Sequence, residues 1–127
     1  MPGEPILIID DNILNLELVT FLLSTKGYDI RTASDAEEAL KTLKVFQPRL
    51  ILMDIQLPDI DGFELTKKLK ADPNYKDILI IAITAFAMKG DKEKVVAAGC
   101  DGYIAKPIDT RTLANIIAGY LRSNTSI

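Results

Sequence analysis

The chain has 127 residues, and 15 Lys and Arg against 18 Asp and Glu leave it with a formal net charge of −3. The absence of His excludes imidazole metal ligands and His bases, and a single Cys excludes disulfides within the chain and Cys-cluster zinc sites. The acidic balance disfavours a nucleic-acid-binding surface. The length suits one domain with its own core, so we predict a single domain over residues 1–127, with a core from about 5 to 122 and a frayed tail over 123–127.

The sequence contains no segment typical of export or of a membrane span. The N-terminus, Met1–Pro5, lacks a basic region ahead of its short apolar run. The longest purely apolar run, Ile78–Ile83, is far shorter than the ~20 residues that a bilayer needs. We therefore expect a cytoplasmic protein without a membrane partner.

The first part of the chain alternates twice between a strand and a helix. Ile6–Ile9 is apolar at every position, which is typical of a strand covered on both faces. A helix is expected to begin after Asn12, a favourable N-cap residue, and to end at Gly27. Tyr28–Thr32 alternates apolar and polar positions, which predicts an edge strand. Ser34–Glu37 has the pattern of a capping box and predicts the start of the second helix.

Two further runs that are apolar throughout, Leu50–Met53 and Ile78–Ile83, predict two more central strands. Between them a helix is expected to begin at Asp61 and to end near Asp72.

The remaining chain predicts a helix over Asp91–Ala98, a short edge strand over Gly102–Ala105 and a last helix from Asp109. Strand and helix thus alternate five times. This alternation predicts an α/β three-layer sandwich around a parallel five-stranded sheet. With Tyr28–Thr32 and Gly102–Ala105 at its two edges, the order 2-1-3-4-5, which is known from flavodoxin-like folds, fits the sheet.

In such a sheet ligands bind beyond the carboxyl ends of the strands, where the winding direction reverses between the first and third strands. Crowded carboxylates bind hard cations such as Mg²⁺, and a carboxylate can itself form an acyl phosphate. Lys and hydroxyl groups stabilise phosphoryl oxygens. The polar residues that follow the predicted strands supply this whole set for phosphoryl chemistry: Asp10, Asp11, Asp54, Thr84 and Lys106.

Each of these residues alone has a simpler interpretation. Adjacent acids before a helix usually cap it, and Asp after a strand favours a turn. A lone Thr84 is most often a strand residue, and a lone Lys106 is most often a solvated surface charge. The functional interpretation gains weight because the carboxylates fall at the same end of neighbouring strands, where they repel one another.

Five motifs of the chain belong together: Ile8–Asn12, Met53–Pro58, Gly62, Ile83–Ala85 and Tyr103–Pro107. In these motifs the chain resembles, from about Ile6 to Leu121, the receiver domain of two-component response regulators. The segment Ala85–Asp91 further resembles single-domain cell-cycle regulators of the DivK type, and similar runs occur in other receivers.

The resemblance implies that Asp54 is the phosphoacceptor. It also implies a Mg²⁺ site made by Asp10, Asp11, Asp54 and the main-chain carbonyl of Gln56.

The resemblance further implies that Thr84 and the main-chain amide of Ala85 bind the phosphoryl oxygens, and that Lys106 pairs with the phosphoryl group. Tyr103 is expected to change rotamer together with Thr84. The Lys106–Pro107 peptide bond is expected to be cis.

The function implied is a phosphorylation-activated switch that signals by protein contact. Its phosphodonor is expected to be a histidine kinase or a histidine phosphotransfer protein, and its target an unidentified protein. No catalysis is expected beyond its own phosphoryl transfer and slow dephosphorylation.

Four alternatives remain. The chain is compatible with a receiver fragment of a larger regulator or hybrid kinase, and with a receiver that binds partners without phosphorylation. An aspartyl-phosphate hydrolase is disfavoured, because Gln56 stands where a second acid would serve the leaving group. A flavodoxin-like redox carrier is disfavoured because Asp10 and Asp11 would repel a flavin phosphate.

Overall fold

The computed structural model describes residues 3–84 and 89–125. Within these residues five strands form one parallel sheet of order β2-β1-β3-β4-β5, which confirms the predicted order. The strands are β1 (Pro5–Ile9), β2 (Asp29–Ala33), β3 (Leu50–Asp54), β4 (Leu79–Thr84) and β5 (Gly102–Ala105).

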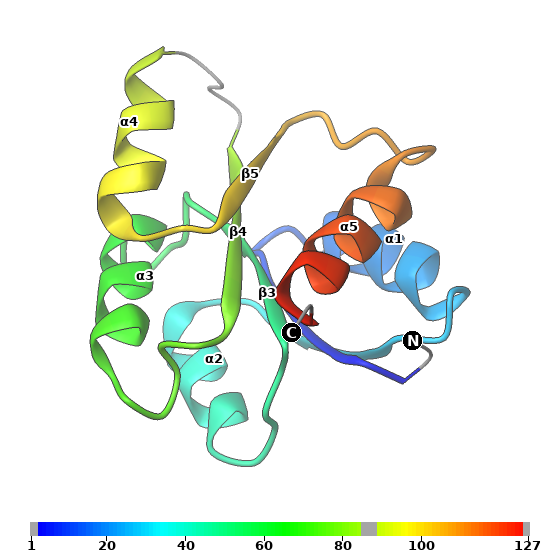
Figure 1. Ribbon diagram of the computed structural model, residues 1–127, viewed down its shortest axis with the longest axis horizontal. Helices are drawn as coiled ribbons and strands as arrows, with labels where there is room; N and C mark the ends of the chain where they lie inside the picture. The colour runs from blue at the N-terminus through cyan, green and yellow to red at the C-terminus, as the bar shows by residue number, and fades with distance from the viewer. Residues whose placement is uncertain (1–2, 85–88, 126–127) are drawn as a thin grey trace.

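Five helices connect the strands and cover both faces of the sheet, so the molecule has three layers (Figure 1). Helices α2, α3 and α4 lie on one face, and α1 and α5 lie on the other. None of the helices in the described residues is both long and apolar enough to cross a membrane. Their bounds are α1 (Ile13–Ser24), α2 (Ala36–Leu43), α3 (Gly62–Ala71), α4 (Lys89–Ala98) and α5 (Leu113–Thr125).

The central strands are buried on both faces because Ile6–Ile9 and Leu50–Met53 are apolar at every position. Side chains alternate along a strand, so each strand contributes to two separate clusters. Toward α2 and α3, β1 and β3 contribute Leu7, Ile9, Ile51 and Met53. Toward α1 and α5, they contribute Ile6, Ile8, Leu50 and Leu52.

The helix starts nearest the expected site follow local capping chemistry, with one correction. The Asn12 side chain accepts the Asn15 amide at 3.2 Å and begins α1 as predicted. Helix α2 is capped by Asp35 rather than Ser34, because the Asp35 carboxylate accepts the Glu38 amide at 2.8 Å. Glu38, instead of Glu37, completes the box by accepting the amide of Ser34 at 3.0 Å.

The last two helices also differ from prediction. Helix α4 begins at Lys89 rather than Asp91, so Gly90 lies inside the helix despite its low propensity. Helix α5 begins at Leu113, because the Asp109 carboxylate first accepts the Arg111 amide at 2.9 Å in a separate turn. It then continues to Thr125, so residues 123–125 are helical where a frayed tail was expected.

The start of α3 approaches the backbone that follows β3 very closely. The Gly62 amide donates to the Ile55 carbonyl at 2.8 Å. A Cβ at Gly62 would lie 2.7 Å from Cα of Ile55 and 2.9 Å from the carbonyl oxygen of Asp54. This approach therefore requires a glycine.

Gly62→Ala should consequently destabilise the protein by roughly 1–3 kcal/mol, the usual cost of overpacking a site that cannot relax. Gly119→Ala is the matched control, because a Cβ there meets nothing within 4 Å. In the interior of α5 this control should gain up to about 1 kcal/mol of stability from helix propensity. Urea unfolding measures both, and a Gly62→Ala variant as stable as the parent would contradict the packing.

Candidate functional site

Three carboxylates meet beyond the carboxyl ends of β1 and β3. Ile9 pairs with Met53 across these strands, so the residues that follow are neighbours. One oxygen each from Asp10, Asp11 and Asp54 lies within 4.8 Å of the other two. Asp10 and Asp54 are buried, whereas Asp11 is exposed at the entrance. The structure thus places these three predicted residues together.

The pKa of Asp10 is shifted by its surroundings. Burial raises the pKa of Asp10, and the nearby Asp54 charge raises it further. The Asn12 amide, 2.9 Å from Asp10 Oδ1, and the Lys106 ammonium oppose the shift in pKa. The net effect is a raised pKa, so an ionised Asp10 costs stability wherever no cation balances its charge.

The Asp54 carboxylate is held by one donor on each oxygen. Oδ1 accepts the main-chain amide of Gln56 at 2.9 Å, and Oδ2 accepts Lys106 Nζ at 3.0 Å. The Gln56 amide is a local donor, two residues beyond Asp54, whereas Lys106 lies 52 residues away and is brought to the site by its place directly after β5. These contacts orient the buried carboxylate and offset part of its charge.

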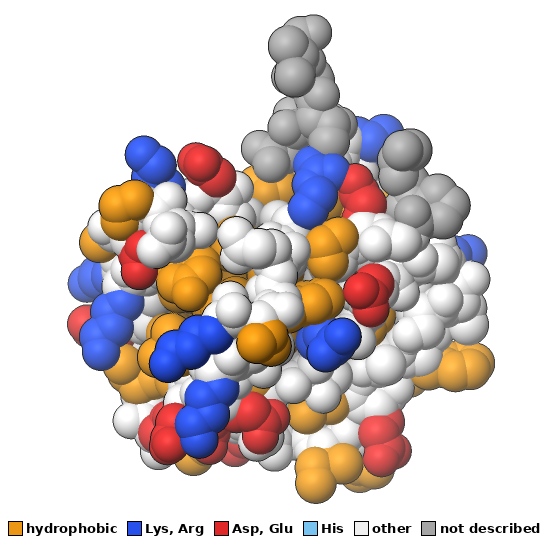
Figure 2. Space-filling model, turned by 90° about the horizontal axis from the view of Figure 1, so that it is seen from below, with side chains coloured by type: hydrophobic (Ala, Val, Ile, Leu, Met, Phe, Trp, Pro, Cys, Tyr) orange, Lys and Arg blue, Asp and Glu red, His pale blue; other side chains and the backbone are white. Residues whose placement is uncertain are grey.

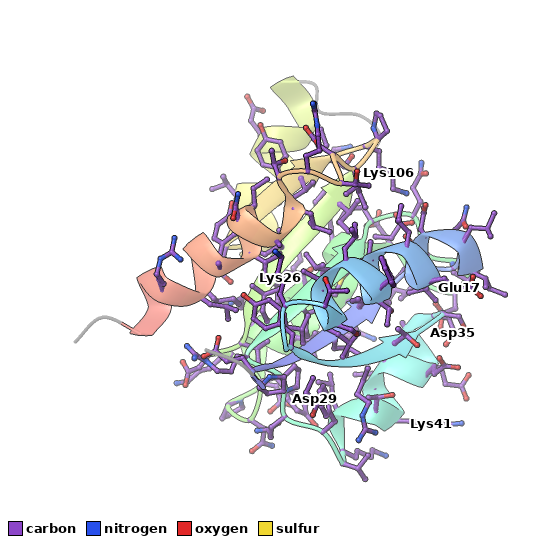
Figure 3. All side chains as sticks on the ribbon, turned by 90° about the vertical axis from the view of Figure 1, so that its right-hand side faces the viewer. Glu17, Lys26, Asp29, Asp35, Lys41 and Lys106 are labelled. Carbon is purple, nitrogen blue, oxygen red and sulfur yellow. The ribbon has the colours of Figure 1, made fainter. Side chains whose placement is uncertain are left out.

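Lys106 reaches the site because β5 lies beside β4. Its own amide donates to the Thr84 carbonyl at 2.8 Å, and the following Lys106–Pro107 peptide bond is cis, as the resemblance implied. In Figure 3, Lys106 and Asp35 lie toward the end of the molecule where the strands finish, and Lys26 and Asp29 lie toward the other end.

Thr84 is buried at the end of β4. Together with Asp11 and Gln56 it lines an open cleft of about 850 Å³ between the residues after β3 and the helices α3 and α4. The cleft leaves room for a group larger than a metal ion beside the carboxylates. The main-chain donor expected at Ala85 lies outside the described residues.

Tyr103 lies farther from the carboxylates. Strand β5 pairs Ala105 with Thr84 and Tyr103 with Ala82, so Tyr103 and Thr84 share a face of the sheet two positions apart. Its side chain is half-buried. The structure therefore places Tyr103 next to the end of β4 and not in the acidic cluster.

Asp59 makes contacts in this region that sequence reasoning missed. It lies in the loop after Asp54, and its carboxylate accepts the amides of Ala36 and Glu37 at 3.0 and 3.1 Å. These amides hold the pKa of Asp59 below its usual range, with Ala36 contributing most. The two partners are 23 and 22 residues away along the chain, so no local sequence pattern predicts the contact.

The arrangement suits binding of a hard divalent cation and attack by a carboxylate. Three clustered carboxylates favour a cation with oxygen ligands, and Mg²⁺ needs few protein ligands because it retains water. A buried, oriented carboxylate next to a Lys can act as a nucleophile toward a phosphoryl group.

The sequence matches a known protein family. The family model for the response regulator receiver domain matches residues 6–118. The polar-differentiation response regulator DivK of Brucella ovis is 47% identical over 119 residues, which cover 93% of this chain and 96% of that protein. The predicted likeness to the DivK type is confirmed.

Solved structures agree in fold. The chemotaxis response regulator CheY4 of Vibrio cholerae superposes with a TM-score of 0.87 at 28% identity, over 92% of this chain and 98% of that one. The receiver domain of a Pseudomonas aeruginosa sensor histidine kinase gives a TM-score of 0.85 at 32% identity, over 94% and 98% of the two chains. That structure has a magnesium ion coordinated in its active-site cleft.

Removal of one buried charge tests the electrostatics of the cluster. In EDTA at pH 7, Asp10→Asn should raise the Tm by a few degrees, because the folded state then holds one fewer buried negative charge. The pKa of Asp10 is higher in the folded than in the unfolded state, so its ionisation destabilises the fold at pH values above the folded-state pKa. The gain in Tm should therefore shrink as the pH falls toward about 3.9, the ordinary value for Asp.

Asp29→Asn removes an exposed carboxylate at the opposite end of the sheet and serves as the control. It should leave the Tm nearly unchanged. A lower Tm for Asp10→Asn than for the parent in EDTA would show that this carboxylate stabilises the fold without a cation.

Proposed function

This chain belongs to the response regulator receiver domain family, and on that premise we propose that Asp54 accepts a phosphoryl group in a two-component phosphorelay. The observation that carries the proposal is the state of the Asp54 side chain. It is buried beside two other carboxylates, and each of its oxygens is held by a separate donor. The family is a signalling switch rather than a classical enzyme.

The same carboxylates fit a Mg²⁺ site. Asp10, Asp11 and Asp54 would hold the ion together with the main-chain carbonyl of Gln56, which lines the same cleft as Asp11. When bound, Mg²⁺ neutralises charge on the carboxylates and on the phosphoryl oxygens. The raised pKa of Asp10 and the repulsion behind it support this assignment.

The transfer step exchanges one bond to phosphorus for another. A carboxylate oxygen of Asp54 attacks the phosphorus of a phosphohistidine on the donor protein. The new P–O bond forms as the P–N bond breaks, and the imidazole leaves and takes up a proton from water. Lys106 stabilises the charge on the transferred group, because its ammonium already lies 3.0 Å from the accepting carboxylate.

Phosphorylation then changes the conformation of residues on β4 and β5. The Thr84 hydroxyl and the Ala85 amide donate to the phosphoryl oxygens, and the movement of Thr84 makes room for the Tyr103 ring to turn inward. Support comes from the register, which places Tyr103 on the same face as Thr84 in the next strand. The protein later loses the phosphoryl group by its own slow hydrolysis.

The partners are proteins. The donor is a histidine kinase or a histidine phosphotransfer protein, and the output is contact with a target protein. Helix α1 supports docking of the donor, because directly after Asp11 it exposes large apolar side chains. These are Ile13, Leu14, Leu18 and Phe21, with 66, 75, 41 and 67% of their surfaces exposed.

Neither nucleic acid nor a membrane surface is a partner, and the protein acts in the cytoplasm. On the face shown in Figure 2, Lys and Arg side chains are interspersed with acidic and hydrophobic ones. A nucleic-acid-binding surface instead gathers its basic residues into a patch or stripe.

The phosphoacceptor is tested by incubation with acetyl phosphate and Mg²⁺, followed by intact-mass measurement. The parent should gain the mass of one phosphoryl group, and Asp54→Asn should gain none because the amide lacks a nucleophilic oxygen. Asp29→Asn is the control and should label like the parent. Labelling of Asp54→Asn at the parental rate would place the acceptor elsewhere.

The switch is tested by NMR with beryllofluoride, a mimic of the phosphoryl group. In the parent, amide shifts should change both around Asp54 and along β5 near Tyr103. Lys106→Ala should still bind the mimic but show reduced changes along β5, because the ammonium no longer draws the end of β5 toward the phosphoryl group. Lys26→Ala, remote from the site, should behave like the parent. Full β5 changes in Lys106→Ala would contradict the assigned role.

A further inference from the structure

The loop between β3 and α3, residues 55–61, reaches from Asp54 to another helix. Its residue Asp59 places one carboxylate oxygen 3.0 Å from the Ala36 amide and the other 3.1 Å from the Glu37 amide. These are the first two amides of α2, where a negative charge is favoured by the unpaired N–H groups and by the helix dipole.

This contact spans the acidic cluster. Strand β1 lies between β2 and β3 in the sheet, and α2 follows β2. A bond from the loop after β3 to the start of α2 therefore crosses the carboxyl end of β1. Asp10 and Asp11 leave the sheet at that end. The two segments that flank the cluster on this face are thus joined by Asp59.

Helix α2 has its own cap and does not depend on Asp59 for one. Asp35 accepts the Glu38 amide at 2.8 Å, as an N-cap residue normally does. Asp59 adds two bonds from a distant loop, and the amides it binds would otherwise face water. The contact therefore serves to hold the loop in place rather than to cap the helix.

The loop contains the residue that the cation site needs from the main chain. Gln56 donates its amide to Asp54 and lines the cleft with Asp11, and it bridges to Asp61 at the other end of the loop. The Gly62 amide fixes that end by donating to the Ile55 carbonyl at 2.8 Å. Asp59 anchors the tip of the same loop to α2. The Gly62–Ile55 bond and the Asp59 contacts therefore both restrain the main chain at Gln56.

We propose that Asp59 is a positioning residue for the cation site, which holds the β3–α3 loop so that the Gln56 carbonyl faces the carboxylates. The proposal rests on the proposed function, because it takes Mg²⁺ to bind at Asp10, Asp11, Asp54 and Gln56. Groups that orient metal ligands without touching the metal typically change its affinity by about 10- to 100-fold.

The test is a Mg²⁺ titration of the full chain by calorimetry, with amide NMR as a second readout. Asp59→Ala should weaken Mg²⁺ binding by about tenfold, the lower end of the range for orienting groups. Asp59→Asn retains an oxygen for one of the two amides and should fall between Asp59→Ala and the parent. Circular dichroism shows whether each variant is folded.

Asp35→Ala is the matched control. It removes one negative charge and one capping bond from the same end of α2, but no contact with the loop. It should lower the Tm and leave the Mg²⁺ affinity within about twofold of the parent, since the energetic coupling between sites that share no contacts is small.

The outcomes separate the two proposals. If folded Asp59→Ala or Asp59→Asn binds Mg²⁺ as tightly as the parent, the positioning role is wrong and the cation site stands. If Asp35→Ala loses as much affinity as Asp59→Ala, the effect comes from charge or helix stability, and the positioning role is again wrong. A parent that does not bind Mg²⁺ would overturn the cation site and the positioning role together.

Discussion

The repulsion among Asp10, Asp11 and Asp54 is the constraint on which the functional end of this molecule depends. One oxygen from each of the three carboxylates lies within 4.8 Å of the other two, and two of the three residues are buried. Such a cluster is unfavourable for the fold alone, since burial and like charge both oppose ionisation. The neighbouring groups that partly offset it, Lys106 and the Gln56 amide, are the groups that a phosphoryl acceptor requires.

The order and direction of the strands bring these carboxylates together. Parallel strands end at the same edge, and the direction in which successive strands are added to the sheet reverses between β1 and β3, so the loops diverge there and leave the carboxylates accessible. The two apolar clusters on either side of the sheet hold β1 and β3 rigidly beneath the site. The apolar packing of the strands that position the carboxylates thus offsets the destabilising repulsion among them, as is common for functional sites.

Much of this could be predicted from sequence because the relevant interactions are local or periodic. Fully apolar runs identify central strands, and polar residues directly after them identify the edge where Asp54 lies. Contacts between segments distant in sequence escaped prediction. The Asp59 carboxylate accepts the amides of Ala36 and Glu37, which lie 23 and 22 residues away along the chain. No pattern within either segment indicates this contact. The later start of α5 has a different cause, a local turn in which the Asp109 carboxylate accepts the Arg111 amide.

The central claim is that the acidic cluster is a cation-dependent phosphoacceptor site centred on Asp54. A crystal structure of the protein with Mg²⁺ and beryllofluoride tests it most directly. The account predicts the metal among Asp10, Asp11 and Asp54, and the beryllium on an oxygen of Asp54. It also predicts that Lys106 Nζ moves from the carboxylate to a fluoride. Density for the metal or the fluoride away from Asp54, with the cluster unchanged, would contradict it.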